Sequence, residues 1–341
     1  ILNVSFVMNE LVDKHSRPLN YLRISVTDRC NYRCSYCMPK EIFNNNYKFL
    51  RRDDLMTFEE NLMVVEALSE LGLTKVRLTG GEPLLRKNIE KLVSSIKSVK
   101  NIKEVALTTN GSLLNPLKIT QLHDNGLESI TISLDSLNVE TNNAINPYHV
   151  NDSVIEAIKN ATNVFKKVKV NFVVIKNVND SEILNTISQF KDFKIQLRFI
   201  EFMDVGQTNN WNKNDVISSD QIIDKVRGVY EINKIISPKS STAELWSINN
   251  ANIEIGVISS ISKPFCHSCN RGRLSADGKF FTCLFSNQGE DILSLIRSGM
   301  DKKGLVRHFS KIWHNRDDRY SLDRSNLNSK KSKIEMSYIG G

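Results

Sequence analysis

Between residues 21 and 201, short β-branched runs alternate with amphipathic segments of helical period. The runs are YLRISVTD, KVRLTG, EVALTTN, SITISLD, VKVNFVVI and IQLRFIEF. This alternation of strand and helix patterns predicts right-handed crossovers and a parallel sheet. Six such units are too few for a complete eight-stranded barrel. We therefore predict an α/β fold, a partial (β/α)6 TIM-like barrel, in preference to a flat doubly wound sheet.

The amphipathic segments carry helix signals of their own. The first begins with Thr57 and Glu60 in capping-box positions and ends at Gly72. Further helices are predicted at residues 88–99, 117–125, 152–166 and 181–190.

The strand–helix rhythm breaks after residue 201. A polar stretch, GQTNNWNKND, precedes one more helix near residues 219–226 and some irregular strands. We divide the chain into an N-terminal segment, the partial barrel and a C-terminal extension that closes the open side of the barrel. Their expected bounds are residues 1–20, 21–204 and 205–341.

Four loops with unusual composition follow the first four strands. They contain the cysteine motif CNYRCSYC and the stretches TGGEP, TTNG and SLDS. Because active residues gather at the C-terminal ends of parallel strands, we expect these loops to share one rim.

The charge of the chain is compatible with several kinds of binding partner, and its hydropathy bears on whether it spans a membrane. Lys and Arg outnumber Asp and Glu by 46 to 38, and the resulting +8 fits nucleic acid, a membrane surface or a small polyanion. The aromatic–basic interleaving of single-strand binders is missing, and no apolar run approaches the roughly 20 residues that cross a bilayer. The first residues do not resemble a secretion signal. We expect no nucleic acid, no membrane span and a cytoplasmic location; whether Ile1 or Met8 is the true start stays open.

Six cysteines fall into two triplets with none left over. The triplets have C-x3-C-x2-C and C-x2-C-x13-C spacing and consist of Cys30, Cys34 and Cys37, and of Cys266, Cys269 and Cys283. A long chain without an export signal favours metal or cluster ligation over three disulfides.

The first triplet offers one ligand fewer than a closed site needs. Thiolates suit zinc or iron–sulfur clusters, and both a structural zinc and a fully ligated [4Fe–4S] cube take four ligands. The spacing, with Tyr36 before the last cysteine, resembles the radical S-adenosylmethionine (SAM) superfamily. That resemblance implies that SAM occupies the open iron and that TGGEP at residues 79–83 contacts its methionine amino group. A zinc knuckle with a distant fourth ligand is the alternative.

The second triplet is also one ligand short. His267 could complete a Cys3His zinc site, but adjacent residues such as Cys266 and His267 rarely both point at one metal. We expect a second open cluster whose free iron faces a substrate across the barrel mouth.

Basic residues lie on the predicted strands and beside the second triplet. Arg271 and Arg273 share one face of an extended segment, where both could bind one anion. Inward-pointing Arg23, Arg77 and Lys169 would each need an anionic partner, which a triphosphate supplies.

Two open triplets in this order, CSYCMP early, CNRGR late and a terminal GG resemble the GTP 3′,8-cyclase (MoaA) family of molybdenum cofactor biosynthesis. The resemblance runs from about Arg17 to Gly341. It implies a homodimeric radical SAM lyase with two [4Fe–4S] clusters, one cleaving SAM and the other binding the guanine of GTP. It further implies hydrogen removal from the ribose C3′ and attack on C8, giving (8S)-3′,8-cyclo-7,8-dihydro-GTP.

The resemblance also assigns residues. The six cysteines match the cluster ligands. The positions that match contacts to SAM are Tyr36, Gly81, Ser133 and Met203. The positions that match contacts to GTP are Arg23, Arg77, Thr108, Lys169, Arg271 and Arg273, with Lys75 and Arg198 as weaker candidates. Arg271, Arg273 and the tail glycines Gly340 and Gly341 match residues that support cyclisation.

The implied partners are GTP as substrate, flavodoxin or ferredoxin as electron donor, and cyclic pyranopterin monophosphate synthase as acceptor of the product. Two other hypotheses stay open. One is a radical SAM enzyme that modifies a peptide, although such proteins commonly carry more C-terminal cysteines than the three seen here. The other is a zinc-bearing nucleic-acid binder, motivated by the charge and the cysteine pairs.

Overall fold

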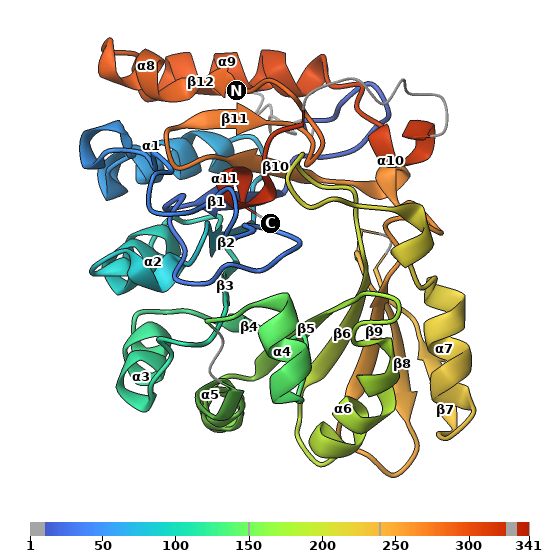
Figure 1. Cartoon of the computed structure of the whole chain (residues 1–341). Coiled ribbons are helices and arrows are strands. Elements are labelled where there is room, and N and C mark those ends of the chain that lie inside the picture. Colours follow the sequence, from blue (N-terminus) through green and yellow to red (C-terminus); the bar gives the residue numbers. More distant parts are fainter. Residues whose placement is uncertain (1–10, 149–150, 239, 325–332, 341) are drawn as a thin grey trace, which may run out of the picture.

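One twelve-stranded sheet organises the chain in the computed structural model, which describes residues 11–148, 151–238, 240–324 and 333–340 (Figure 1). Its six central strands are parallel and follow the sequence order, as predicted. They are β1 (Tyr21–Ser25), β2 (Lys75–Thr79), β3 (Glu104–Thr109), β4 (Ser129–Ser133), β5 (Lys167–Val174) and β6 (Gln196–Glu201). The sheet ends at β12 and β7 and stays open, which confirms the partial barrel.

Helices connect these strands at the predicted places. They are α1 (Phe58–Ser69), α2 (Ile89–Lys97), α3 (Pro116–Asp124), α5 (Asn151–Val164) and α6 (Ile183–Phe190). The capping box of α1 forms as predicted, since Thr57 Oγ1 accepts from the Glu60 amide at 3.1 Å and Glu60 accepts from the Thr57 amide at 2.7 Å. An additional short helix, α4 (Val139–Ile145), precedes α5. The sequence analysis missed α4 because VETNNAI has no apolar stripe.

The C-terminal extension adds strands to both edges of the barrel sheet. β10 (Arg271–Leu274) pairs parallel to β1, and β9 (Glu254–Ile258) pairs parallel to β6, so six parallel strands become eight among the described residues. Antiparallel strands continue each edge: β11 (Lys279–Phe281) and β12 (Glu290–Asp291) on one side, β8 (Glu244–Ile248) and β7 (Ile232–Ile235) on the other. Strands from before and after residue 204 belong to one sheet, and the division of the chain at that point stays a prediction.

Further helices of the extension complete the structure. They are α7 (Ser219–Arg227), α8 (Ile292–Arg297), α9 (Lys302–His314), α10 (Tyr320–Asp323) and α11 (Met336–Ile339). Short 3-10 helices lie at Arg52–Asp54, Pro83–Leu85, Asp180–Glu182, Lys213–Asp215 and Cys266–Ser268. None of the helices within the described residues has the length and apolarity needed to cross a membrane.

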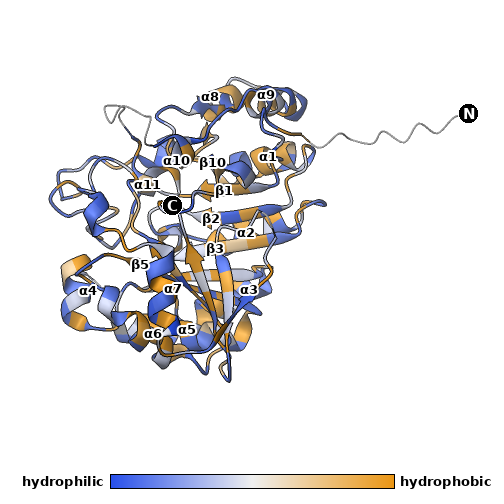
Figure 2. Ribbon diagram, turned by 90° about the vertical axis from the view of Figure 1, so that its right-hand side faces the viewer, coloured by the Kyte–Doolittle hydropathy of each residue, from blue (hydrophilic) through white to orange (hydrophobic). Residues whose placement is uncertain are grey.

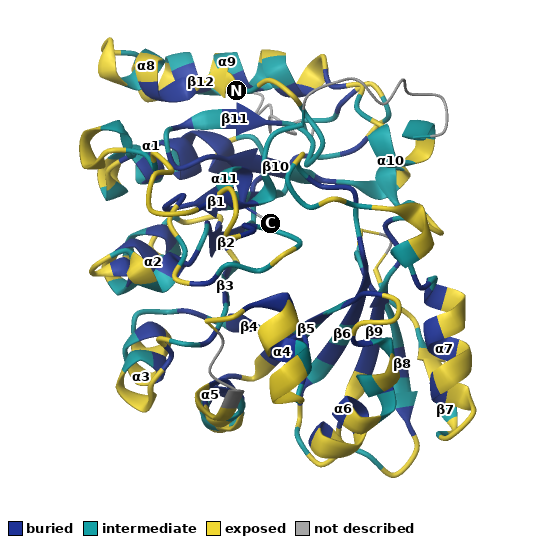
Figure 3. Cartoon of the chain, in the orientation of Figure 1, coloured by how far each residue is buried: buried dark blue, intermediate teal, exposed yellow. Residues whose placement is uncertain are grey.

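The two faces of the central strands differ in character. Alternate residues, such as Leu22 and Ile24 on β1 or Val76 and Leu78 on β2, pack against the helices and are fully buried. Figure 3 shows the central strands as largely buried and the outward sides of the helices as exposed, and Figure 2 shows hydrophobic and hydrophilic residues mixed along α1, α2 and α3. The remaining positions, such as Arg23 and Arg77, form the polar inner face of the barrel.

Candidate active site

A cavity of about 620 Å³ extends along this inner face, and both cysteine triplets line it. The loops after the first four strands contribute Cys30, Gly81, Asn110 and Asp135 to its wall, so the predicted convergence of these loops is confirmed. The extension contributes further residues to the wall of the cavity, among them Phe265, Leu284, Phe285, Met336 and Ser337.

The cavity is lined by all six cysteines and by every residue that the sequence analysis named as a contact to SAM or GTP, Lys75 and Arg198 included. Gly340 packs against β1 and β2, and Gly341 lies outside the described residues. The individual roles of these residues stay predictions.

The first triplet occupies one compact loop. The amides of Cys37 and Met38 both donate to the Cys34 carbonyl, at 3.0 and 2.8 Å, and so form a tight turn. Gly81 is required beside this loop, because a Cβ there would lie 2.2 Å from the Arg29 carbonyl oxygen. The glycine pair of TGGEP therefore lets the loop after β2 pack directly on the cysteine loop.

Two buried carboxylates lie near the first triplet. Glu82 is 1% exposed and accepts from the Asn110 amide at 2.7 Å and from Thr109 Oγ1 at 2.8 Å. Asp135 accepts from the Tyr36 hydroxyl at 2.5 Å and from the Val173 amide at 2.9 Å. Burial raises the pKa of Glu82 to about 7 and that of Asp135 to about 6.

The sequence analysis quoted these carboxylates within TGGEP and SLDS but gave them no role. The available signal was their position just after β2 and β4, at the carboxyl ends of two barrel strands.

Basic side chains form a row across the neighbouring strands. Arg273, Arg23 and Arg77 lie opposite one another in register on β10, β1 and β2. Arg77 donates through Nε to the Tyr21 hydroxyl at 2.6 Å and through Nη1 to Thr131 Oγ1 at 2.8 Å. The buried Nε of Arg23 has no hydrogen-bond partner among the described residues.

These cations repel one another in a site with little water. Burial and the charge of Arg198 lower the pKa of Lys169 to about 6, and burial and Arg77 lower that of Arg198 to about 9. Burial acts to raise the pKa of Tyr21, but Arg77, Arg23 and Lys75 outweigh it and bring it down to about 6. Such a cluster of desolvated cations fits a polyanionic ligand.

The second triplet begins on the 3-10 turn Cys266–Ser268, in which the Cys269 amide donates to the Cys266 carbonyl at 3.2 Å. Burial acts to raise the pKa of Cys269, but the charges of Arg271 and Arg316 outweigh it and lower the pKa to about 6. Burial and Asp318 raise the pKa of Cys283 to about 12.

All six cysteines are free, so the expected preference for ligation over disulfides is consistent with the structure. Within the described ranges, no group of three His, Cys, Asp or Glu side chains is arranged to hold a single metal ion. A [4Fe–4S] cube does not need that arrangement, because each cysteine binds a different iron. Three soft donors at each end of the cavity fit such a cube with one iron open.

The end of the chain lies against the barrel strands. The carbonyl of Gly340 accepts from the guanidinium of Arg273, and a Cβ at residue 340 would lie 2.6 Å from Thr79 Cγ2. The Tyr338 hydroxyl donates to Asp277 and contacts Lys279 Nζ at 3.3 Å. The tail is thus held beside the basic row.

Comparisons with known proteins agree with the fold and the site. Residues 24–190 match the Radical SAM superfamily, and residues 195–322 match the family described as Molybdenum Cofactor Synthesis C. The structure of Streptococcus suis SuiB bound to precursor peptide SuiA superposes with a TM-score of 0.61 at 15% identity, covering 93% of this chain and 69% of that one. The structure of anSMEcpe with bound AdoMet gives 0.50 at 22% identity, covering 62% and 58%. Fold and site define a radical SAM enzyme.

Curated relatives narrow this class. GTP 3′,8-cyclases from Staphylococcus saprophyticus and Staphylococcus epidermidis are 41% and 43% identical to this chain, each over 98% of the chain and 100% of the relative. The enzyme of the same name from Staphylococcus haemolyticus is 42% identical over 97% of this chain and 99% of the relative. The chain belongs to the GTP 3′,8-cyclase family. The predicted fold, the radical SAM chemistry with [4Fe–4S] and SAM, and the place in molybdenum cofactor biosynthesis are thereby confirmed.

Proposed function

We propose that this cavity cyclises GTP to (8S)-3′,8-cyclo-7,8-dihydro-GTP, with SAM bound at the first triplet and guanine at the second. The observation that carries this proposal is that both triplets and the basic row line one continuous cavity. A substrate bridging the row and the second triplet would present its ribose to the SAM end.

When bound at the first triplet, a reduced [4Fe–4S] cluster and SAM would supply the radical chemistry that joins C3′ of the ribose to C8 of guanine. The chain binds and orients the reactants. Tyr36, Gly81, Ser133 and Met203, which line the cavity, would hold SAM. The Tyr36 hydroxyl is held in place by its 2.5 Å hydrogen bond to Asp135.

The basic residues neutralise and align the triphosphate. Arg23 offers an unpartnered Nε, and Lys169 gains a counter-charge that restores its ammonium form. Thr108, Arg77, Lys75 and Arg198 complete this part of the wall.

The tail and the second triplet support the ring closure. Arg273 donates to the Gly340 carbonyl, which holds Gly340 beside the basic row, and Arg271 lines the cavity as Cys269 does. Arg271, Arg273, Gly340 and Gly341 would therefore act during cyclisation, when the guanine is held at the second cluster.

Family membership supports the remaining partners. We infer a cytoplasmic homodimer that receives electrons from flavodoxin or ferredoxin and passes its product to cyclic pyranopterin monophosphate synthase. Light scattering of the purified protein would test the dimer, and reduction by each donor in turn would test the electron source. The division into an N-terminal segment, a barrel to residue 204 and an extension is likewise part of this proposal.

The decisive experiment is anaerobic incubation of the reconstituted enzyme with GTP, SAM and dithionite, followed by mass spectrometry. We expect 5′-deoxyadenosine and cyclised GTP in equal amounts, and little SAM cleavage when GTP is left out. Cleavage that requires a peptide and ignores GTP would contradict the proposal and favour a peptide-modifying enzyme.

A further inference from the structure

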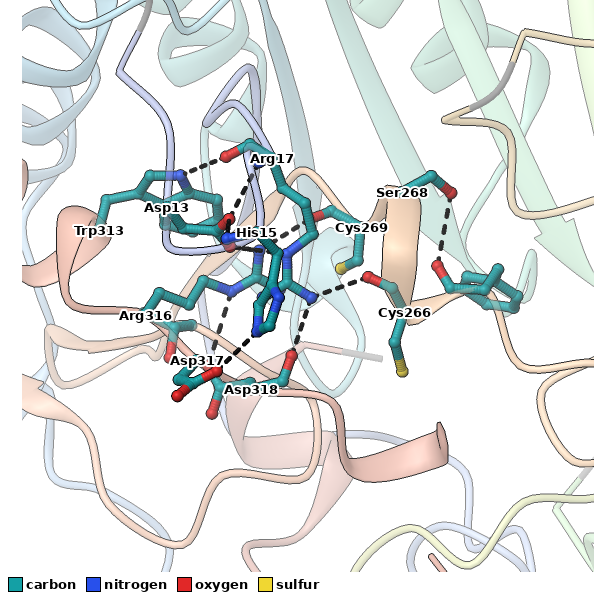
Figure 4. A network of polar contacts seen from close by, with 12 residues as sticks. Asp13, His15, Arg17, Cys266, Ser268, Cys269, Trp313, Arg316, Asp317 and Asp318 are labelled. Atoms are coloured by element: carbon teal, nitrogen blue, oxygen red, sulfur yellow. Dashed lines mark hydrogen bonds and ion pairs between the residues drawn. The ribbon is translucent and has the colours of Figure 1, made fainter. Parts of the chain in front are cut away.

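Two buried arginines contact the second cysteine triplet without lining the cavity. Arg17 and Arg316 are 2% and 4% exposed. Nη1 of Arg17 donates to the carbonyl of Cys266 at 2.8 Å, and Nη1 of Arg316 donates to the carbonyl of Cys269 at 2.7 Å. Figure 4 shows the two guanidiniums side by side, each reaching one cysteine. Each of the first two cysteines of the triplet is therefore held by its own cation.

A shared carboxylate holds the arginines together. Asp13 Oδ2 accepts from Arg17 Nε at 2.7 Å and from Arg316 Nη1 at 3.1 Å, and the Asp13 side chain is fully buried. Asp13 Oδ1 accepts from the Arg17 amide at 2.9 Å. Because an unpaired buried charge is costly, the three side chains stabilise this arrangement only as a set.

The same network reaches the third cysteine. Arg17 Nη1 also donates to the Asp318 carbonyl at 2.8 Å, and the Asp318 carboxylate accepts from Thr282 Oγ1 at 2.5 Å. Thr282 directly precedes Cys283 in the chain. All three cysteines are thus linked to a network built from residues before β1 and after α9.

Packing fixes the network in place. Trp313 Nε1 donates to the Arg17 carbonyl at 2.9 Å, and the Arg316 guanidinium lies 4.4 Å from the Trp313 ring centre. Trp313 is fully buried. Neither arginine is free to turn toward the cavity, so a direct role in binding substrate is not open to them.

We propose that Asp13, Arg17 and Arg316 are positioning residues for the second cluster. They fix the peptide planes of Cys266 and Cys269 and therefore the directions of the two thiolates. The segment before β1 thus contributes to the geometry of the second cluster site. Outer partners of metal ligands act in this way by holding the ligand geometry. The proposal rests on the cluster assigned to this triplet under the proposed function.

The first triplet provides a matched counterpart. Arg33 Nη1 donates to the Cys30 carbonyl at 2.7 Å, and its Nε donates to the Phe43 carbonyl at 2.6 Å. Arg33 therefore holds the backbone carbonyl of one cysteine of the first triplet, and it belongs to the same loop as that cysteine. Substitution of Arg33 should affect the first cluster, and substitution of Arg17 or Arg316 the second.

The test uses two parent variants of the full chain. In one, Cys30, Cys34 and Cys37 are changed to Ala; in the other, Cys266, Cys269 and Cys283 are. Each parent should hold about four irons after anaerobic reconstitution. Arg17→Gln, Arg316→Gln and Arg33→Gln are then added to both parents. Iron release to a chelator and the EPR spectrum of the reduced cluster are measured.

We expect Arg17→Gln and Arg316→Gln to speed iron release from the second cluster by roughly 10–100-fold and to change its EPR spectrum. The first cluster should change less than about twofold, and Arg33→Gln should give the reverse pattern. Arg17→Lys keeps the charge but not the forked donors, so it should fall between Arg17→Gln and the parent.

His15→Ala is the control within the network. It removes the 2.6 Å contact of His15 to Asp317 but leaves the contacts to Cys266 and Cys269, so both clusters should behave as in the parents. Equal loss of both clusters in the Arg17→Gln and Arg316→Gln variants, or an unchanged second cluster, would overturn the positioning role. A parent that takes up no iron at the second triplet would overturn the cluster assignment and this proposal together.

Discussion

The two ends of the cavity contain the same number of cysteines, but different charged residues lie beside them. Glu82 and Asp135 lie at the first triplet, and burial together with these carboxylates raises the pKa of Cys30 to about 11 and that of Cys34 well above its usual value. At the second triplet, Arg271 and Arg316 outweigh burial and lower the pKa of Cys269 to about 6, whereas burial and Asp318 raise that of Cys283 to about 12. The acidic end suits the cationic sulfonium of SAM, whereas the basic end suits a nucleotide triphosphate.

The two ends also differ in how the chain builds them. Cys30 to Cys37 lie within one loop, and their main supports, Arg33 and Gly81, come from that loop and the next strand end. The second triplet depends on Asp13 and Arg316, which are 303 positions apart. The first site therefore has its ligands and supports close together in the sequence, whereas the side chains that support the second triplet meet only in the folded chain.

The largest expected effect separates the two clusters. Cys34→Ala and Cys269→Ala should each lower the iron content from about eight to about four per chain. Cys34→Ala should reduce SAM cleavage to background, because the open iron that binds SAM is lost. Cys269→Ala should keep some SAM cleavage but form no cyclised product. Iron analysis with quantification of 5′-deoxyadenosine checks this prediction. Loss of SAM cleavage in both variants would contradict the assignment of SAM cleavage to the first cluster alone.

Removing charge from the basic end should give the next largest effect. We expect Arg271→Ala combined with Arg273→Ala to weaken GTP binding by a few kcal/mol, roughly a hundredfold, while both clusters and SAM binding persist. Isothermal titration with GTP measures it. Lys302→Ala, at an exposed ion pair with Glu70, is the control that should bind GTP normally. An unchanged GTP affinity in the double variant would refute the phosphate role.

Removing a negative charge at the acidic end should weaken the binding of SAM but not the binding of GTP. Asp135→Asn should weaken SAM binding by about tenfold, because it removes a buried negative charge beside the first triplet and the charged acceptor of Tyr36. GTP affinity should stay within about twofold. Equilibrium dialysis with each ligand measures both values. If Asp135→Asn weakened GTP binding as much as SAM binding, the division of charge between the ends would not govern ligand choice.

A pH dependence of GTP binding should be the smallest effect. The pKa values of Lys169 and Tyr21 are both about 6 in the empty site, and a triphosphate favours the protonated form of each. GTP binding should therefore take up protons above pH 6, and affinity should fall as pH rises from 6 to 8, by no more than about tenfold per group per pH unit.

Calorimetric titrations with GTP in buffers of different ionisation enthalpy measure the number of protons taken up on binding. Lys169→Met and Tyr21→Phe should each flatten the profile. A profile that rises with pH, or one that neither variant alters, would show that other groups control binding.

Much of the candidate site was predictable because its residues follow strand ends and have rigid spacing. The open parallel sheet, the rim of four loops and the inward basic residues of β1, β2 and β5 all came from period and position. The strands of the extension could not be predicted in this way. In β10, with the sequence RGRL, Arg271 and Arg273 occupy the inward positions, so the usual alternation of polar and apolar residues is hard to recognise. Its parallel pairing with β1 joins residues some 250 positions apart, which no local pattern records.

The amino-acid order alone determined the helices, the central strands and the identity of the ligating sulfurs, because these depend on contacts between near neighbours in the chain. Tertiary structure alone decided which charges gather at each end of the cavity and which side chains support the second triplet. Those outcomes depend on burial and on contacts across hundreds of residues, as in the meeting of Asp13, Arg17 and Arg316.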